Sequence, residues 1–314
     1  MITEATVSQP KKRTNVRPNP WALTAVRAAL AAVESRSPDL AARAVEHLMF
    51  RTTRHPTPDR ERAVLATGRP FAVSSRHGRI AAWRWGEGPV VILTHGWNGR
   101  GSQLGALVEP LVQRGFQVVT FDAPGHGASR GGSASLPAFA DALDAVIDAV
   151  RSPFEPVHAV VAHSMGGAAT TYGMSRFRRV PETYVERAIR EAELPVRRFV
   201  FVASPVDMRD FVRSAGKMLH VGPTTQAAVS RRVEARFGLR LEDLYAPAAA
   251  RHLHAPLLVI HDEDDREVPI ACGHLLASAW PGAQLHVTRG LGHMRILRDE
   301  GVVQKIVEFV SDPA

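Results

Sequence analysis

The sequence predicts an α/β fold in which helices flank a mostly parallel sheet. Short continuous apolar runs of strand length alternate along the chain with segments whose apolar residues recur at helical spacing. The runs lack polar alternation, which is typical of parallel strands that are covered on both faces. With 314 residues, 45% of them hydrophobic, the chain is long enough to bury one large core. The expected strands lie at residues 90–94, 118–121, 157–162, 199–203, 257–261 and 285–288.

The segment that precedes these strands is predicted to be a helical extension over residues 20–60. Apolar residues recur at helical spacing from residue 21 to residue 50, and Ser37 and Pro38 divide the pattern into two helices. We expect this extension to pack against the core.

A hairpin is expected at the start of the core, where strand-like runs at 70–74 and 79–85 are joined by turn residues. After the run at 199–203, more than 50 residues pass before the next strand. They carry three helical patterns, at 208–219, 225–237 and 241–252. An insertion at the carboxyl end of a strand is well placed to cover an active site. The predicted organisation is therefore a core at 61–204 and 253–314 with a helical cap, or lid, at 205–252.

Composition and charge exclude several classes of function. The 39 Lys and Arg residues exceed the 31 Asp and Glu residues by eight, but the arginines are scattered and often lie beside glutamates. No basic stripe interleaved with aromatic residues is present, so no nucleic-acid partner is expected. No apolar stretch reaches about 20 residues, so no membrane span is expected. The single cysteine, Cys272, excludes an intramolecular disulfide and a thiolate metal cluster.

The first 19 residues are predicted to be a disordered basic tail. They contain Lys11, Lys12 and Arg13 and lack the apolar core of a secretory signal. We therefore expect a cytoplasmic protein.

A serine stands at a predicted junction between a strand and a helix. The run at 157–162 leads directly into Ser164, and a helical pattern follows. A nucleophilic serine on such a sharp turn needs small residues two positions before and after it, and here these are Ala162 and Gly166. The turn also places the Met165 amide at a helix N-terminus, where it can stabilise a developing oxyanion.

Together with two further motifs, this turn resembles the α/β-hydrolase superfamily over about residues 70–312. The family motif is G-x-S-x-G, and Ala162 replaces its first glycine. The further motifs are HGWNG at 95–99 and FDAPGHGAS at 121–129. The resemblance implies that the Trp97 amide completes the oxyanion hole with Met165 and that the Trp97 ring lines the pocket. We expect His95, Asp122 and His126 to hold loops in place rather than to act as catalysts.

A catalytic serine needs a histidine base and a carboxylate that orients it. In this fold the chain order is serine, acid, histidine, and His293 is the well-placed late histidine. The resemblance favours Asp265 as the acid because the family pattern is G-x-x-D-x-x-V-P, although Asp262 stands in the position of the glycine. Asp264 and Asp207 remain alternatives. The acidic cluster lacks the spaced ligands and central glycine of a calcium loop, so no metal and no cofactor is expected.

The resemblance implies a serine hydrolase, and we expect it to cleave carboxylic esters through an acyl-enzyme. A serine at position 164 argues against the dehalogenases and epoxide hydrolases of the superfamily, which need an aspartate there. Trp97, Met208 and Phe211 are expected to bind a small to medium acyl or aromatic group of a small-molecule ester. Carbon–carbon bond, thioester or amide hydrolysis and perhydrolysis use the same triad and stay open, as does a non-catalytic ligand receptor. The sequence indicates no particular oligomeric state.

Overall fold

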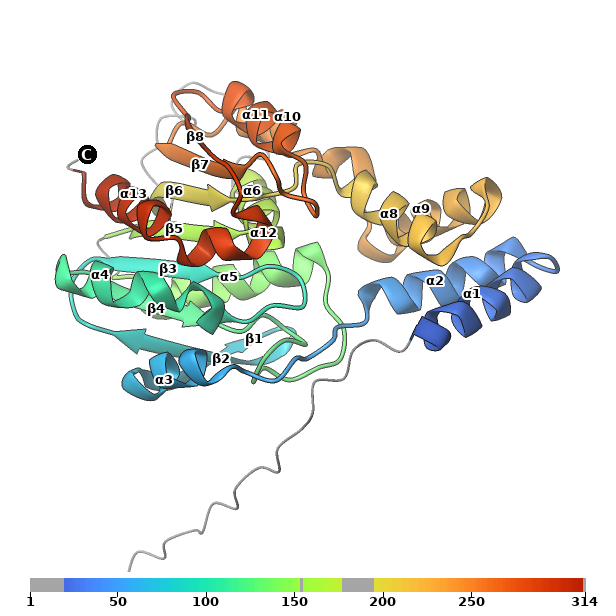
Figure 1. Ribbon diagram of the computed structural model, residues 1–314, viewed down its shortest axis with the longest axis horizontal. Coiled ribbons are helices and arrows are strands. Elements are labelled where there is room, and N and C mark those ends of the chain that lie inside the picture. The colour runs from blue at the N-terminus through green and yellow to red at the C-terminus, as the bar shows by residue number, and fades with distance from the viewer. Residues whose placement is uncertain (1–19, 153–154, 177–194, 313–314) are drawn as a thin grey trace, which may run out of the picture.

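An eight-stranded sheet forms the centre of the protein. The computed structural model describes residues 20–152, 155–176 and 195–312. The predicted tail at 1–19 lies outside these ranges. The strand order is β1-β2-β4-β3-β5-β6-β7-β8. Strands β1 and β2 form the predicted hairpin, β2 pairs antiparallel with β4, and the remaining pairs are parallel (Figure 1). The expected α/β fold is therefore confirmed. The strands are β1 Arg69–Ser75, β2 Gly78–Trp85, β3 Val90–Thr94, β4 Gln117–Phe121, β5 Val157–His163, β6 Val196–Val202, β7 Leu257–Asp262 and β8 Gln284–Thr288.

Helices cover both faces of the sheet, which explains why the strands are apolar throughout. Side chains that are neighbours along a strand point to opposite faces, so Val91 and Ile92 belong to different buried clusters. The helices α5, α6, α10 and α11 pack over one cluster, and η1, α4 and α13 pack over the other. Their bounds are η1 Gly101–Leu107, α4 Val108–Gln113, α5 Leu136–Val150, α6 Met165–Arg176, α10 Ala246–Ala250, α11 Ile270–Ala279 and α13 Glu300–Ser311; the short α12 Gly292–Arg295 and η3 Ile296–Arg298 precede α13.

The N-terminal extension forms the two predicted helices, α1 (Pro20–Glu34) and α2 (Pro38–Phe50). The break lies where expected, because the Ser37 hydroxyl accepts from the Leu40 amide and caps α2. These helices make their main contacts away from the core, contrary to expectation, and only the end of α2 is joined to it. They lie against α8 (Met208–Leu219) and α9 (Pro223–Phe237) of the cap and share an apolar cluster with them (Figure 1).

The third helical pattern of the cap is interrupted, contrary to expectation. A short turn, η2 (Leu241–Leu244), is separated from α10 by Tyr245 in an extended conformation. Pro247 cannot donate to the carbonyl four residues earlier, and its ring clashes with that carbonyl, so a single helix cannot continue through it. A helix that was not predicted, α3 (Asp59–Thr67), lies at the boundary between the extension and the core. No helix of the described residues is long and apolar enough to cross a membrane.

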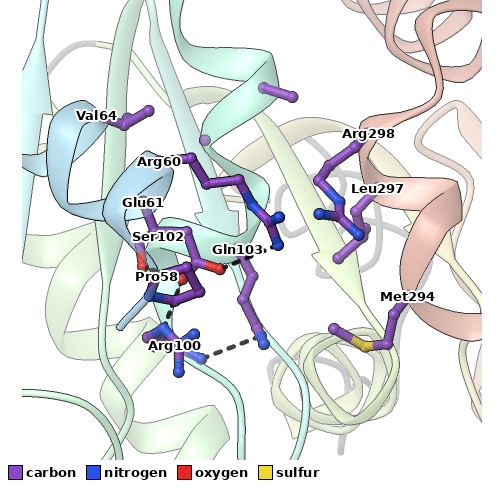
Figure 2. A pocket seen from close by; sticks show the side chains of 12 residues that line it. Pro58, Arg60, Glu61, Val64, Arg100, Ser102, Gln103, Met294, Leu297 and Arg298 are labelled. Atoms are coloured by element: carbon purple, nitrogen blue, oxygen red, sulfur yellow. Dashed lines mark hydrogen bonds and ion pairs between the residues drawn. The ribbon is translucent and has the colours of Figure 1, made fainter. Parts of the chain in front are cut away.

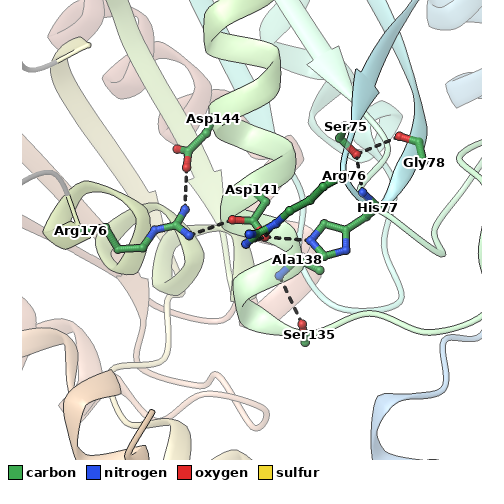
Figure 3. Close-up of polar contacts among 9 residues, drawn as sticks. All are labelled: Ser75, Arg76, His77, Gly78, Ser135, Ala138, Asp141, Asp144 and Arg176. Atoms are coloured by element: carbon green, nitrogen blue, oxygen red, sulfur yellow. Dashed lines mark hydrogen bonds and ion pairs between the residues drawn. The ribbon is translucent and has the colours of Figure 1, made fainter. Parts of the chain in front are cut away.

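A polar cluster joins the β1–β2 turn to α5 and α6 (Figure 3). The Asp141 carboxylate accepts hydrogen bonds from Arg76, from His77 at 2.8 Å and from Arg176 at 2.8 Å. Arg176 also donates to Asp144 at 2.5 Å. One half-buried carboxylate therefore holds the hairpin turn and two helices of the core together.

Candidate active site

Ser164 occupies a strained turn between β5 and α6. Its φ is 52°, in the left-handed region that residues other than glycine rarely adopt. Its amide donates to the Val202 carbonyl at 2.9 Å, and its carbonyl accepts from the Gly167 amide at 2.9 Å. A Cβ at Gly166 would lie 2.7 Å from the His95 carbonyl oxygen, so the turn needs glycine there. The methyl group of Ala162 is fully buried in the sheet, which shows that alanine fits the position of the first motif glycine.

The loop after β3 passes directly beside this serine. A Cβ at Gly96 would lie 2.8 Å from the Ser164 Cβ and 3.3 Å from its Oγ, so only glycine allows this approach. The next residue, Trp97, is thereby brought to the serine. In the part of the chain that the structure describes, the amides of Trp97 and Met165 donate to no backbone carbonyl outside their own helix or strand. First-turn amides such as that of Met165 lack helical partners and are suited to bind an oxyanion.

Two buried histidines hold this loop in place. His95 Nδ1 donates to the Gly96 carbonyl at 2.7 Å, while its Nε2 accepts from the Ala123 amide at 2.9 Å. His126 Nδ1 donates to the Pro124 carbonyl at 2.9 Å, and its Nε2 accepts from the Asn98 amide at 3.0 Å. Burial lowers the pKa of His95 to about 4 and that of His126 to about 3. Both rings are therefore neutral at pH 7 and bridge backbone groups.

Asp122 fixes the same region from the end of β4. Its carboxylate accepts from the Gly101 and Ala128 amides, each at 2.8 Å. Burial raises the pKa of this carboxyl, and the two backbone hydrogen bonds oppose the rise. Its hydrogen bonds connect the loop after β3 to the loop after β4, as expected for a residue that holds loops in place.

Asp265 is the carboxylate that lies against His293. Its Oδ2 is 2.7 Å from His293 Nδ1, and its Oδ1 accepts from the amides of Glu267 and Val268 at 2.8 and 2.9 Å. Burial raises the pKa of this carboxyl, but the hydrogen bonds from His293 and from the two amides outweigh it and lower the pKa. Asp265 is therefore ionised at neutral pH and holds one ring nitrogen of His293.

The two alternative acids are engaged elsewhere. Asp264 accepts from the Gly290 amide at 3.0 Å. Asp207 caps α8 and pairs with Arg209, whose Nη2 is 2.6 Å from it. The structure thus brings Asp265, and neither alternative, to the histidine.

Asp262 has a structural role that was not predicted from the sequence. It is fully buried at the end of β7. Its Oδ1 accepts from the Asp264 and Gly292 amides, and its Oδ2 accepts from the Leu291 amide and the Thr288 hydroxyl, all between 2.7 and 3.0 Å. The carboxylate therefore joins the turn that carries Asp265 to the loop that carries His293. The presence of Asp262 in place of the motif glycine was the sequence signal that could have predicted this role.

His163, immediately before the serine, also contacts the histidine loop. Its Nε2 donates to the His293 carbonyl at 3.0 Å, and the two rings lie 4.7 Å apart. Burial is the main reason that the pKa of His163 falls to about 3. Within the described residues, no hydrogen bond joins the Ser164 hydroxyl to His293, and His293 Nε2 lies 3.8 Å from a carboxylate oxygen of the exposed Glu267. Catalytic hydrogen bonds are often long before substrate binds and tighten in the complex.

An apolar cavity of about 30 Å³ lies next to the serine turn. Trp97, Met165, Met208 and Phe211 line it, so it contains all three residues expected to bind the apolar group. The Trp97 and Phe211 rings meet edge to face at 5.6 Å. Residues of α2 and α9 complete the wall. The contribution of α2 was not expected from the sequence.

A second depression, of about 380 Å³, lies between α3 and the segment after His293 (Figure 2). Here the buried Arg100 donates to Glu61 at 2.5 Å, and the Ser102 hydroxyl donates to the same oxygen at 2.9 Å. Its lining includes neither Ser164 nor Trp97. The ion pair fixes the far end of the loop after β3 to α3. Among the described residues, no group of three or more His, Cys, Asp or Glu side chains is arranged to hold a metal ion.

The chain is similar in sequence to known hydrolases. The chain is 30% identical to the pimeloyl-[acyl-carrier protein] methyl ester esterase of Xanthomonas axonopodis pv. citri, over 72% of this chain and 96% of the relative. It is 28% identical to a 2-hydroxy-6-oxononadienedioate/2-hydroxy-6-oxononatrienedioate hydrolase of Dechloromonas aromatica, over 59% of this chain and 73% of the relative.

Among solved structures, an esterase of Pyrococcus furiosus superposes with a TM-score of 0.59 at 16% identity, covering 83% of this chain and 98% of that one. This likeness supports the fold. The model of the alpha/beta hydrolase family matches residues 91–305. The chain therefore belongs to the α/β hydrolase family.

Proposed function

We propose that this protein is a serine ester hydrolase that works through Ser164, His293 and Asp265. The observation that carries the proposal is the 2.7 Å contact between His293 Nδ1 and Asp265, on a loop adjoining the strained Ser164 turn. The esterase named among the relatives supports hydrolysis of a carboxylic ester, which would be a small-molecule substrate.

In the proposed mechanism, His293 Nε2 takes the proton from the Ser164 hydroxyl as its oxygen attacks the ester carbonyl. The ionised Asp265 holds the ring by Nδ1 and stabilises the imidazolium that forms. The amides of Trp97 and Met165 donate to the oxyanion. His293 then protonates the departing alcohol, and water releases the acid from the acyl-enzyme by the same steps.

The apolar cavity supports a site for the acyl group of the substrate. Met165 and Trp97, whose amides are proposed to form the oxyanion hole, line it, and nearly all of its other lining side chains are hydrophobic. At about 10–15 Å³ for each water-sized group, 30 Å³ holds about two or three such groups. This size supports a short acyl group.

The test compares wild type with Ser164→Ala, using p-nitrophenyl acetate and a fluorophosphonate probe. We expect wild type to turn over the ester and to be labelled at Ser164, and the variant to lose both, with at least a 10³-fold fall in kcat. Circular dichroism would establish that the variant is folded. Labelling without turnover of any ester would reject ester hydrolysis and favour carbon–carbon or amide bond hydrolysis. A folded wild type with neither property would reject the serine mechanism.

A further inference from the structure

The N-terminal helices α1 and α2 are built into the cap. Residues of α1, α2, α8 and α9 form one buried apolar cluster, which is distinct from the two clusters on the faces of the sheet. The helices α1 and α2 lie beside α8 and α9 at one side of the molecule (Figure 1). The family model matches from residue 91 onward, so this pair of helices is additional to the part of the chain that defines the family.

Polar contacts between segments far apart in the sequence hold the pair in place. The buried Glu46 carboxylate accepts from Arg232 at 2.7 Å and from Arg236 at 3.0 Å. Glu34 accepts from the Gly222 amide at 2.7 Å. An unpaired Glu46 would be costly at this depth, so these contacts commit α2 to α9.

The C-terminal end of α2 is also attached to the core. The Phe50 carbonyl accepts from the Ala134 amide at 2.9 Å, and Thr52 donates its amide to Gly132 at 3.0 Å. The Thr53 amide donates at 2.8 Å to the side chain of Asn98, the residue after Trp97. The end of α2 is therefore fixed on both sides, by the cap and by the loops around the serine.

This attachment places two large side chains of α2 in the wall of the apolar cavity. Met49 and Phe50 line it together with Trp97 and Met165, and they are only 7% and 6% exposed. The Phe50 ring meets the Phe237 ring edge to face at 5.4 Å, and the Arg236 guanidinium lies 5.1 Å from the centre of the Phe50 ring. Phe50 is therefore held rigidly at the boundary of the cavity.

We infer that Met49 and Phe50 determine which acyl groups the enzyme accepts, by closing the apolar cavity against longer chains. The inference rests on the proposed function, because the cavity is taken to hold the acyl group of the Ser164 adduct. The substrate class is a short-chain acyl ester. Each further methylene group that could be buried would improve reaction about fourfold, provided that space existed for it.

The experiment measures kcat/KM for p-nitrophenyl esters from acetate to decanoate in wild type, Met49→Ala, Phe50→Leu and Phe50→Ala. We expect the ratio of octanoate to acetate reactivity to rise at least tenfold in the smaller variants. Phe50→Leu keeps an apolar side chain and tests the idea if loss of the ring contacts prevents Phe50→Ala from folding. Leu40→Ala is the matched control, since Leu40 lies on the same helix and is 55% exposed.

A second readout separates this inference from the proposed function. Rates of labelling by alkyl fluorophosphonates of increasing chain length report on the cavity without any need for ester turnover. The inference is supported if the preferred chain lengthens in the variants by either readout. It is overturned if the folded variants keep the wild-type length profile or if Leu40→Ala shifts it equally. Failure of the fluorophosphonates to label folded wild type at Ser164 would overturn both proposals.

Discussion

Replacing Asp262 by alanine should loosen both loops that carry the proposed catalytic residues. The carboxylate accepts four hydrogen bonds, three of them from backbone amides of the Asp265 turn and the His293 loop. Leaving a buried donor without a partner costs about 1–3 kcal/mol. Water can replace some partners because Leu291 and Gly292 are only half-buried, so we expect a loss of about 3–5 kcal/mol of unfolding free energy.

The same change should lower kcat more than it raises KM. Displacement of a catalytic group by about 1 Å can reduce the rate by about 10²-fold, and His293 directly follows two residues whose amides Asp262 binds. We therefore expect kcat to fall by about 10- to 100-fold. Asp262→Asn should have a smaller effect, because its carbonyl oxygen can still accept from Gly292 and Asp264.

The stability effect should depend on pH in one direction. Burial raises the pKa of Asp262, but the hydrogen bonds from Thr288, Gly292, Leu291 and Asp264 outweigh it and lower the pKa below its ordinary value. The ionised carboxylate therefore stabilises the fold above about pH 4, the ordinary aspartate pKa, and this stabilisation is lost as pH falls through the lowered value. The difference between wild type and Asp262→Ala should shrink in acid.

Urea unfolding of wild type and Asp262→Ala at pH 7 and at pH 3.5 measures the loss of unfolding free energy and its dependence on pH. Steady-state kinetics measures the fall in kcat. Asp264→Ala is the matched control, since its carboxylate holds one amide, that of Gly290. The reasoning would be refuted by a loss below about 1 kcal/mol at pH 7, where a single unpaired donor alone should cost that much. An unchanged kcat in a folded Asp262→Ala would refute the positioning role.

Two further perturbations test other parts of the structure. Asp265→Asn should lower kcat by about 10²- to 10⁴-fold, because an amide cannot stabilise the His293 imidazolium; kinetics equal to wild type would exclude Asp265 as the acid. Asp144→Asn should become more stable relative to wild type as pH rises from 4.5 to 7.5, by about 1–2 kcal/mol in urea unfolding. Burial raises the pKa of Asp144 to about 6, so wild type loses stability as this carboxyl ionises. A stability difference independent of pH would contradict that reasoning.

Local patterns were sufficient to predict the sheet, the serine turn and the division of the extension at Ser37. Continuous apolar runs reflect burial on both faces of each strand, and the small residues beside Ser164 reflect a steric need of the turn itself. The resemblance to the family added Asp265, because the spacing to Val268 and Pro269 matched a known pattern. These features depend on residues that are close together in the sequence.

The tertiary structure decided the features that depend on distant contacts. Asp262 has its role because β7 and β8 are neighbours in the sheet, which brings the amides of Leu291 and Gly292 to its carboxylate. The extension packs on the cap because Glu46 meets arginines 186 and 190 residues further along the chain. Helical spacing shows that α2 has an apolar face, but many surfaces can cover such a face. The arginines of α9 lie beside Glu46 only in the folded chain, and this contact places α2 on the cap. The position of α2 in turn brings Phe50 to the cavity beside the Ser164 turn.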